Sequence, residues 1–369
     1  MAQRLRDSTR ETDLVVRLGG DEFAIVQLAE DQPHSATALS ERVIAVLNQP
    51  FDLDGHQIVI GTSIGVALSP NDGDDPYTLL KNADLALYRA KSDGRNVCRY
   101  FERTMDARMQ ARRLLEVDLR KALAEDELEL VYQPILAVEN RHIVGFEALL
   151  RWNHPTRGRV TPDDFIPLAE EIGLITAIGE WVLRQACTLR RQCRARGHHF
   201  PLSVNISPRQ FHQPGFVARV KAVLDEERVA ARELIFEVTE GLVIEDIDHT
   251  VARMQELAAL GIRFSVDDFG TGYSSLAYLK RMPLHELKID RTFVEDTPDD
   301  PNDTAIVRLV LSMASELGLS VVAEGVETER QAGFLLSHGC DRLQGFLLAR
   351  PVAQQAWLAA LPDLSARPA

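Results

Sequence analysis

Short apolar and polar segments alternate over the first hundred residues, which is typical of a small domain that mixes strands and helices. Two apolar runs, Leu14–Leu18 and Phe23–Val26, flank the polar sequence GGDE and predict two strands joined by a tight turn. The β-branched segment Ile58–Ala67 predicts a further strand. Asp75 and Pro76 have the residue types of an N-cap and a first helical position, so we expect a helix to begin there.

A charged segment with a partial apolar stripe, Glu102–Leu123, follows this region and predicts a connecting helix. We therefore expect a first domain over residues 1–100, a linker helix over 101–115 and a second domain over 116–369. The length of 369 residues agrees with two domains, since a typical domain has about 150 residues.

The second domain alternates strand-like and helix-like segments, which favours a parallel α/β architecture. The predicted strands are Glu129–Ile135, Val144–Arg151, Leu202–Ile206, Leu234–Val238, Arg263–Asp267, Glu286–Ile289, Ser320–Ala323 and Leu343–Phe346. Helical segments such as Glu180–Arg196 and Thr250–Ala259 separate most of them. Eight strands over about 250 residues match the size of a (β/α)8 barrel, and a doubly wound open sheet is the main alternative.

Composition and charge narrow the class of protein. The chain has 45% hydrophobic and 26% charged residues, enough to bury a core, which excludes a wholly disordered or fibrous protein. The net charge of −14 argues against binding a nucleic acid polymer. The chain has no run of 18 apolar residues, so no membrane span is predicted. The N-terminus lacks the apolar core of a signal peptide. The four cysteines lack metal-binding spacing, which predicts reduced thiols and a cytoplasmic location.

Polar residues lie within or at the end of most predicted strands of the second domain, where apolar side chains or turns are expected. These residues are Glu147, Asn205, Glu237, Asp267, Asp268, Lys288, Asp290, Glu324 and Gln344. In a barrel the C-terminal strand ends converge on one mouth, so residues distant in sequence become neighbours. Several carboxylates buried together are costly unless cations bind them. The alternative is that some of these acids cap helices or form salt bridges within the barrel.

Oxygen ligands without cysteine or convergent histidine favour hard cations such as Mg²⁺, Mn²⁺ or Ca²⁺. The adjacent acids Asp267 and Asp268 could serve two metals, as two-metal phosphoester hydrolysis requires. Lys288 could orient a water molecule or stabilise charge on a phosphate. Lys288 and Asp290 are two residues apart on a predicted strand, so both are expected to face the mouth. Trp152 and His154, by contrast, are expected to have packing and turn roles.

The second domain contains, in this order, the motifs EALLRWNHP, VNIS, EVTE, DDFGTGYSS, LKID, AEGVE and QGF. Through these motifs and their order it resembles the EAL family of cyclic di-GMP phosphodiesterases over residues 110–360. The resemblance implies a modified TIM barrel whose first strand runs against the others. It also implies hydrolysis of cyclic di-GMP to linear pGpG at a site with two Mg²⁺ or Mn²⁺ ions, and a homodimer formed through this domain.

The resemblance also implies roles for individual residues. Four side chains would bind one metal: Glu147, Asn205, Glu237 and Asp267. Asp267 and Asp268 would serve a second metal, Lys288 would hold or activate the water, and Glu324 would complete the water and metal shell. Positions used around the substrate and the site are matched by Gln133, Arg151, Asp290, Glu327 and Gln344. Glu240 matches the glutamate that braces the DDFGTGYSS loop.

The first domain resembles the later part of a GGDEF diguanylate cyclase domain, through RLGGDEFAIV, TSIGVA and ADLALYRAKSDGRN. The resemblance implies that Asp21, beside Glu22, is a metal ligand and that Gly19 and Gly20 admit a nucleotide. Lys91 and Arg95 would approach phosphates. Arg10 and Asp13 match the RxxD inhibitory site.

The first strand of the GGDEF family, with its metal-binding Asp, and the helix after it have no counterpart in this sequence. We therefore expect no cyclase activity. We also expect that the shortened domain reflects a truncated gene model, an internal start or a fragment. The leading hypothesis is a phosphodiesterase. The alternative is a receptor or regulatory module that binds cyclic di-GMP without cleaving it, and a diguanylate cyclase is a third, disfavoured, interpretation.

Overall fold

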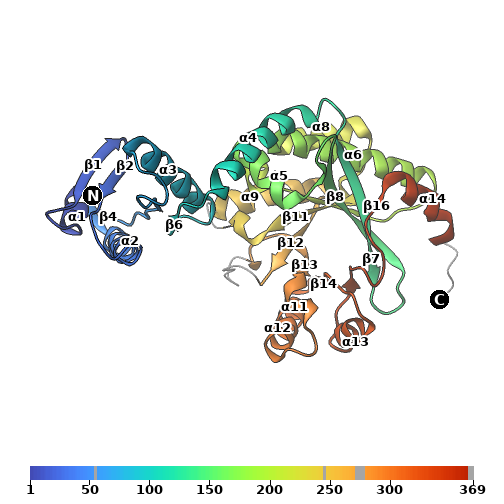
Figure 1. Ribbon diagram of the computed structural model, residues 1–369. Coiled ribbons are helices and arrows are strands. Elements are labelled where there is room, and N and C mark those ends of the chain that lie inside the picture. Colours follow the sequence, from blue (N-terminus) through green and yellow to red (C-terminus); the bar gives the residue numbers. More distant parts are fainter. Residues whose placement is uncertain (54–55, 244–246, 271–278, 365–369) are drawn as a thin grey trace. The chain divides into compact units, whose positions relative to one another are not determined.

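The computed structural model describes residues 1–53, 56–243, 247–270 and 279–364, which form two compact units, Met1–Leu115 and Glu116–Ala369 (Figure 1). Helix α4 (Thr104–Ala122) extends across the boundary between the two units. Within the described ranges, no helix is both long enough and apolar enough to cross a membrane.

The first unit contains a β-hairpin in which β1 (Leu14–Gly19) pairs with β2 (Glu22–Val26). Gly20 adopts φ +52, a left-handed conformation that glycine accepts readily, in the turn of this hairpin. The predicted hairpin is therefore confirmed. The other elements of the unit are α1 (Ala2–Asp7), α2 (His34–Leu47), β3 (Phe51–Leu53), β4 (His56–Ile58), β5 (Ile64–Val66), α3 (Pro76–Ser92) and β6 (Cys98–Tyr100).

The predicted helix after Asp75 is confirmed, because the Asp75 carboxylate accepts hydrogen bonds from the first amides of α3. The prediction of one strand over Ile58–Ala67 is wrong, since β4 ends at Ile58 and β5 begins only at Ile64. Between them the Thr62 amide donates to the Asn96 side chain at 3.2 Å, so it is not available to a strand ladder.

The second unit is a closed barrel within one ten-stranded sheet. Its strands, in chain order, are β7 (Leu128–Ala137), β8 (Ile143–His154), β10 (Leu202–Asn205), β11 (Leu234–Thr239), β12 (Arg263–Phe269), β13 (Leu284–Ile289), β14 (Ser320–Ala323) and β15 (Arg342–Leu343). Strand β7 is antiparallel to both β8 and β15, whereas the neighbours from β8 to β15 are parallel. The predicted barrel and its reversed first strand are confirmed, and the open-sheet alternative is excluded.

Two short strands extend the sheet: β9 (Gly158–Val160) pairs with β8, and β16 (Val352–Ala353) pairs with β7. The helices of this unit, several of which surround the barrel, are α5 (Pro162–Glu171), α6 (Ile175–Ala195), α7 (Pro208–Phe211), α8 (Phe216–Glu227), α9 (Ile247–Leu260), α11 (Arg291–Glu295), α12 (Pro301–Leu317), α13 (Glu329–Ser337) and α14 (Gln354–Leu364) (Figure 1). Short 3-10 turns cover Ala231–Glu233 and Glu240–Val243.

Successive side chains along the barrel strands point alternately outward, into the apolar core under the helices, and inward, into the barrel. Val266, Leu287 and Val321 belong to a buried apolar cluster that also contains Val307 and Leu311 of α12. Residues next to them in the chain, such as Lys288, project from the opposite face of the strands, into the barrel. The apolar packing between strands and helices thus fixes which polar side chains point inward.

His154 anchors the end of β8 to α4. Its Nδ1 accepts the backbone amides of Thr156 and Arg157 at 3.2 and 3.3 Å, so Nε2 carries the hydrogen and donates to Asp118 of α4 at 3.0 Å. The ring is 7% exposed. The sequence predicted the turn role of His154 but not its contact with α4.

His154→Ala should lower the free energy of unfolding of the second unit by about 1–3 kcal/mol, because it leaves Asp118 and two backbone amides without their partner. The three tryptophans (152, 181 and 357) all lie in this unit, so tryptophan fluorescence during urea unfolding measures its stability. His199→Ala, at an exposed position, is the control. Equal unfolding midpoints for both variants would contradict an anchoring role.

Candidate functional site

The barrel brings the predicted polar residues of its strand ends together at one mouth. Each residue comes from a different strand or from the segment directly after it, and all except Lys288 are acids or amides: Glu147 (β8), Asn205 (β10), Glu237 (β11), Asp267 (β12), Lys288 (β13), Glu324 (after β14) and Gln344 (after β15). The strand register explains which site residues are neighbours: Asn205 of β10 lies opposite Glu237 of β11. Lys288 lies opposite Val322 of β14, and Glu324 follows two residues later.

Lys288 is at the centre of this group and is fully buried. Its Nζ lies 2.6 Å from Glu324, 3.0 Å from Glu237, 3.1 Å from Asp267 and 3.4 Å from Glu147. One ammonium therefore contacts four carboxylates. The expectation that Lys288 lies among the acids is confirmed.

Two amide side chains fix the orientation of Glu147. Asn205 donates to its Oε1 at 2.8 Å, and Gln344 donates to its Oε2 at 2.6 Å. The Gln344 amide also lies 3.2 Å from Gln133, whose own amide donates to the backbone oxygen of Ala349 at 3.0 Å. Hydrogen bonds thus link these neutral side chains to Glu147 and, through Gln133, to the backbone.

The site carries more negative charge than Lys288 can neutralise. Burial and the nearby Glu147 raise the pKa of Glu237 well above its usual range, and burial raises the pKa of Glu324 to about 8. Burial alone would also raise the pKa of Glu147, but Lys288 and its amide partners lower it. The pKa of Lys288 is raised, because Asp267 and the other carboxylates outweigh its burial. Additional cations would relieve this crowding.

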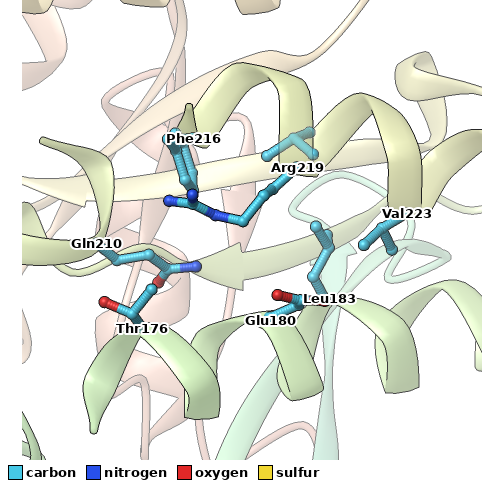
Figure 2. Close-up of a pocket in the computed structure, with 8 residues that line it drawn as sticks. Thr176, Glu180, Leu183, Gln210, Phe216, Arg219 and Val223 are labelled. Carbon is cyan, nitrogen blue, oxygen red and sulfur yellow. The ribbon is translucent and has the colours of Figure 1, made fainter. Parts of the chain in front are cut away.

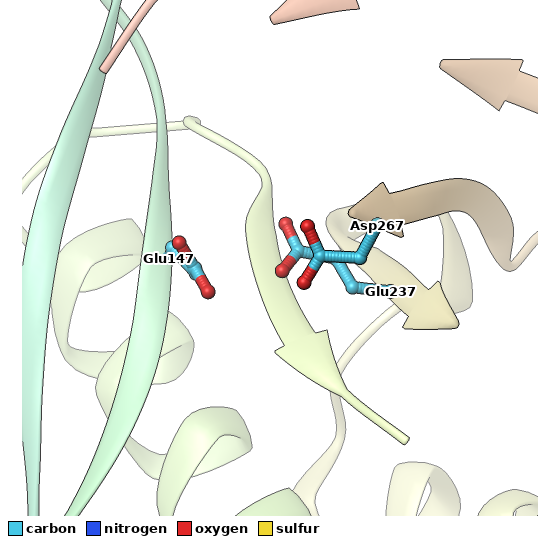
Figure 3. Close-up of side chains that lie close together, drawn as sticks. All are labelled: Glu147, Glu237 and Asp267. Carbon is cyan, nitrogen blue, oxygen red and sulfur yellow. The ribbon is translucent and has the colours of Figure 1, made fainter. Parts of the chain in front are cut away.

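The carboxylates form two groups that could hold divalent cations. Oxygens of Glu147, Glu237 and Asp267 lie within 4.8 Å of one another, as do oxygens of Asp267, Asp268 and Glu324. Figure 3 shows the first group, in which Glu147 comes from β8 and Glu237 and Asp267 come from the adjacent strands β11 and β12. The Oε1 atom of Glu237 is buried and has no hydrogen-bond partner within the described part of the chain. Such oxygen donors fit hard cations, and Asp267 belongs to both groups.

Asp290 lies outside β13, which ends at Ile289, so the expectation from strand alternation does not apply to it. Its carboxylate caps α11 by accepting the Thr292 amide at 2.9 Å, which confirms the helix-cap alternative for this acid. It nevertheless lies close to the mouth. Burial, Asp267 and Asp290 together raise the pKa of Asp268 to about 6.

The remaining residues predicted to bind substrate are less closely tied to the cluster. Arg151 is half-buried on β8, four residues after Glu147, and its guanidinium donates to the backbone oxygen of Leu150 at 2.8 Å. Glu327 is exposed, and its backbone amide donates to the side-chain oxygen of Gln331 at 2.8 Å.

Glu240 contacts the beginning of the DDFGTGYSS segment. Its Oε1 accepts the backbone amide of Gly270 at 2.7 Å, and its side chain is buried. Gly270 has φ +104, a conformation that favours glycine. The residues from 271 to 275 lie outside the described part of the chain, so the predicted bracing is seen only at Gly270.

The residues predicted from the GGDEF resemblance lie in the first unit and are mostly exposed. Gly19, Gly20, Asp21 and Glu22 are exposed in and beside the β1–β2 turn, Lys91 is near the end of α3, and Arg95 follows that helix. Asp13 accepts the backbone amide of Arg10 at 2.8 Å. Both carboxylate groups suited to a metal among the described residues belong to the barrel instead.

A separate pocket lies between α6, α7 and α8. Figure 2 shows residues that line it, with Thr176 and Gln210 on one side and Arg219 and Phe216 opposite. The full lining is Thr176, Glu180, Leu183, Gln210, Phe216, Arg219, Val220 and Val223. This lining shares no residue with the two carboxylate groups of the barrel.

Comparison with known proteins identifies the family to which the chain belongs. The family model of the EAL domain matches residues 116–351, and that of the diguanylate cyclase GGDEF domain matches residues 1–97. The chain therefore belongs to the EAL domain family, with a GGDEF region before the barrel.

Two similar relatives are known from Pseudomonas aeruginosa. The bifunctional diguanylate cyclase/cyclic di-GMP phosphodiesterase MucR is 44% identical over 362 residues, which are 98% of this chain and 53% of MucR. The cyclic di-GMP phosphodiesterase NbdA is 43% identical over 354 residues, 95% of this chain and 45% of NbdA. The chain thus spans about half the length of these curated relatives.

Solved structures show the same barrel. The PaMucR phosphodiesterase in complex with c-di-GMP matches with a TM-score of 0.64 and 46% identity, covering 66% of this chain and 99% of that structure. The EAL domain of Mycobacterium smegmatis DcpA matches with a TM-score of 0.56 and 38% identity, covering 64% and 98%.

Proposed function

We propose that this chain hydrolyses cyclic di-GMP to linear pGpG with Mg²⁺ or Mn²⁺ bound at the barrel mouth. The observation that carries the proposal is the contact of one buried lysine with four carboxylates, at distances of 2.6 to 3.4 Å, where parallel strands end. The activities for which MucR and NbdA are named, and the c-di-GMP bound in the PaMucR structure, support this substrate.

In this proposal Glu147, Asn205, Glu237 and Asp267 would hold one ion, and Asp267, Asp268 and Glu324 would hold the other. When bound, the ions would offset phosphate charge and make water more acidic. Water attacks the phosphorus atom and the bond from phosphorus to the 3′ oxygen breaks. The proton lost by the water ends on that 3′ oxygen, which balances the reaction.

The chain itself supplies orientation and charge for this reaction. The Lys288 ammonium donates to the attacking water or to a phosphate oxygen, and Glu324 beside it accepts hydrogen from the water. We assign substrate contacts to Gln133, Arg151, Asp290, Glu327 and Gln344. Glu240 would fix the backbone at Gly270 next to the second ion. A homodimer through the barrel domain and a cytoplasmic location remain predictions.

Purified chain incubated with cyclic di-GMP should yield pGpG in Mg²⁺ or Mn²⁺, and Ca²⁺ should inhibit. The reason is that all the proposed ligands are oxygens and that Ca²⁺ accepts a larger, looser coordination shell, which misplaces the water. Product chromatography measures the outcome. Full activity in excess chelator would contradict metal dependence, and intact ligand despite measurable binding would favour the receptor alternative.

A further inference from the structure

A fully buried carboxylate lies one layer below Lys288 inside the barrel. Glu286 is two residues before Lys288 on β13, so both side chains project from the same face of the strand, about 7 Å apart along it. Lys288 contacts carboxylates from other strands across the barrel, and this face is therefore the interior. Glu286 is 0% exposed and belongs to neither carboxylate group of the candidate metal site.

The partner of Glu286 is an arginine from another strand of the barrel. Arg342, the first residue of β15, donates from Nη1 to Oε2 of Glu286. Gln344, two residues after Arg342, donates to Glu147, so Arg342 also lies one layer below the candidate site. Glu286 and Arg342 thus form a buried, charged pair one layer beneath the carboxylates of the candidate metal site.

The Glu286–Arg342 pair is not expected to stabilise the barrel more than apolar side chains would at the same positions. The interior layers of such barrels are usually filled by branched apolar side chains, and a buried ion pair is often no more stabilising than an apolar pair of similar volume. Arg342 does not satisfy the whole carboxylate, because Oε1 of Glu286 has no hydrogen-bond partner within the described residues. Burial raises the pKa of Glu286, whereas Arg342, then Lys288 and then the Ser265 hydroxyl lower it.

We propose that Glu286 is a positioning residue that keeps the Lys288 ammonium at its depth in the barrel, directly above the Glu286–Arg342 pair, while divalent cations share the carboxylates around it. The inference rests on the proposed metal-dependent function. Cations held by Glu147, Glu237 and Asp267 would compete with Lys288 for the same oxygens and repel its charge. Glu286 is a carboxylate that belongs to neither of the groups that would bind these cations. It lies on the side of Lys288 away from the strand ends.

The test replaces both charges together, so that the net charge of the chain is unchanged and no buried charge is left unpaired. In E286Q–R342Q, kcat should fall about tenfold with KM within about twofold, because substrate contacts are retained. The dissociation constant of Mn²⁺, measured by calorimetry without substrate, should rise about tenfold, because the repulsion between Lys288 and the ions is no longer offset.

A second variant, E286M–R342M, replaces the pair by apolar side chains of similar length and should show the same two effects. E286D, which keeps the charge, should retain the wild-type Mn²⁺ dissociation constant within about twofold. The matched control is R190Q–E233Q, which neutralises a pair joined at 2.8 Å between buried Arg190 and half-buried Glu233, outside the barrel interior, and should leave kcat and Mn²⁺ binding at wild-type values. Tryptophan fluorescence establishes that each variant is folded.

Wild-type kcat and Mn²⁺ binding in both charge-free variants would overturn the role of Glu286. The proposed function fails separately, if the wild-type chain does not hydrolyse cyclic di-GMP in Mn²⁺. In that case the Mn²⁺ titrations still decide the inference, because weaker binding in E286Q–R342Q supports it and unchanged binding overturns it.

Discussion

Lys288→Ala should reduce kcat by about a thousandfold while binding of cyclic di-GMP remains measurable. The Lys288 ammonium contacts all four carboxylates, so its loss removes the donor that orients the attacking water. Arg151 and the bound ions would still hold the phosphates. Product chromatography in Mn²⁺ gives the rate, and calorimetry in Ca²⁺ gives the binding of substrate without turnover.

The same variant tests the metal site without any assay of activity. Removal of Lys288 leaves buried carboxylates without their shared cation, which destabilises the chain in the absence of metal. Mn²⁺ should therefore raise the unfolding midpoint of Lys288→Ala more than that of the wild type. Lys221→Ala, at an exposed position on α8, should match the wild type in both experiments. If binding and turnover were lost to the same extent, Lys288 would be mainly a substrate anchor.

The barrel could be predicted because its strands are short apolar runs with polar residues at their ends. The eight predicted strands all appear, with bounds that differ by a few residues. The convergence of Glu147, Glu237 and Asp267 followed from the fold class, since parallel strands carry their ends to one mouth. The reversed direction of β7 followed only from the family resemblance, because strand direction leaves no mark on apolar alternation.

Contacts between distant residues could not be predicted. Glu286 was assigned to a strand, but its partner Arg342 is 56 residues away and its burial depends on the closure of the whole barrel. The signal that could have found it is its position two residues before Lys288 on the same strand face. Asp290 was placed on the face of Lys288 by strand alternation, although it follows the end of the predicted strand at Ile289, and the backbone turns into α11 at this residue.

Glu147→Ala should abolish measurable hydrolysis, a fall of at least about a thousandfold, while the chain remains folded. Glu147 is 4% exposed, and its carboxylate lies in the first group of oxygens that could hold an ion. Its loss removes a ligand and one negative charge. Calorimetry should show that Mn²⁺ binds at least about tenfold more weakly.

The variant is expected to fold because Glu147 adds to the crowding of negative charge in the chain without metal. Its carboxylate, after burial, is the main cause of the raised pKa of Glu237, so its removal relieves repulsion that offsets the cost of the cavity. Glu147→Gln keeps the volume and separates the two effects. Both variants should lose turnover alike if charge and ligation matter, whereas Glu226→Ala, an exposed acid paired with Arg184, should keep wild-type kcat. Wild-type turnover in Glu147→Ala would show that the ions are held elsewhere, because no other acid of β8 within the described barrel belongs to either carboxylate group.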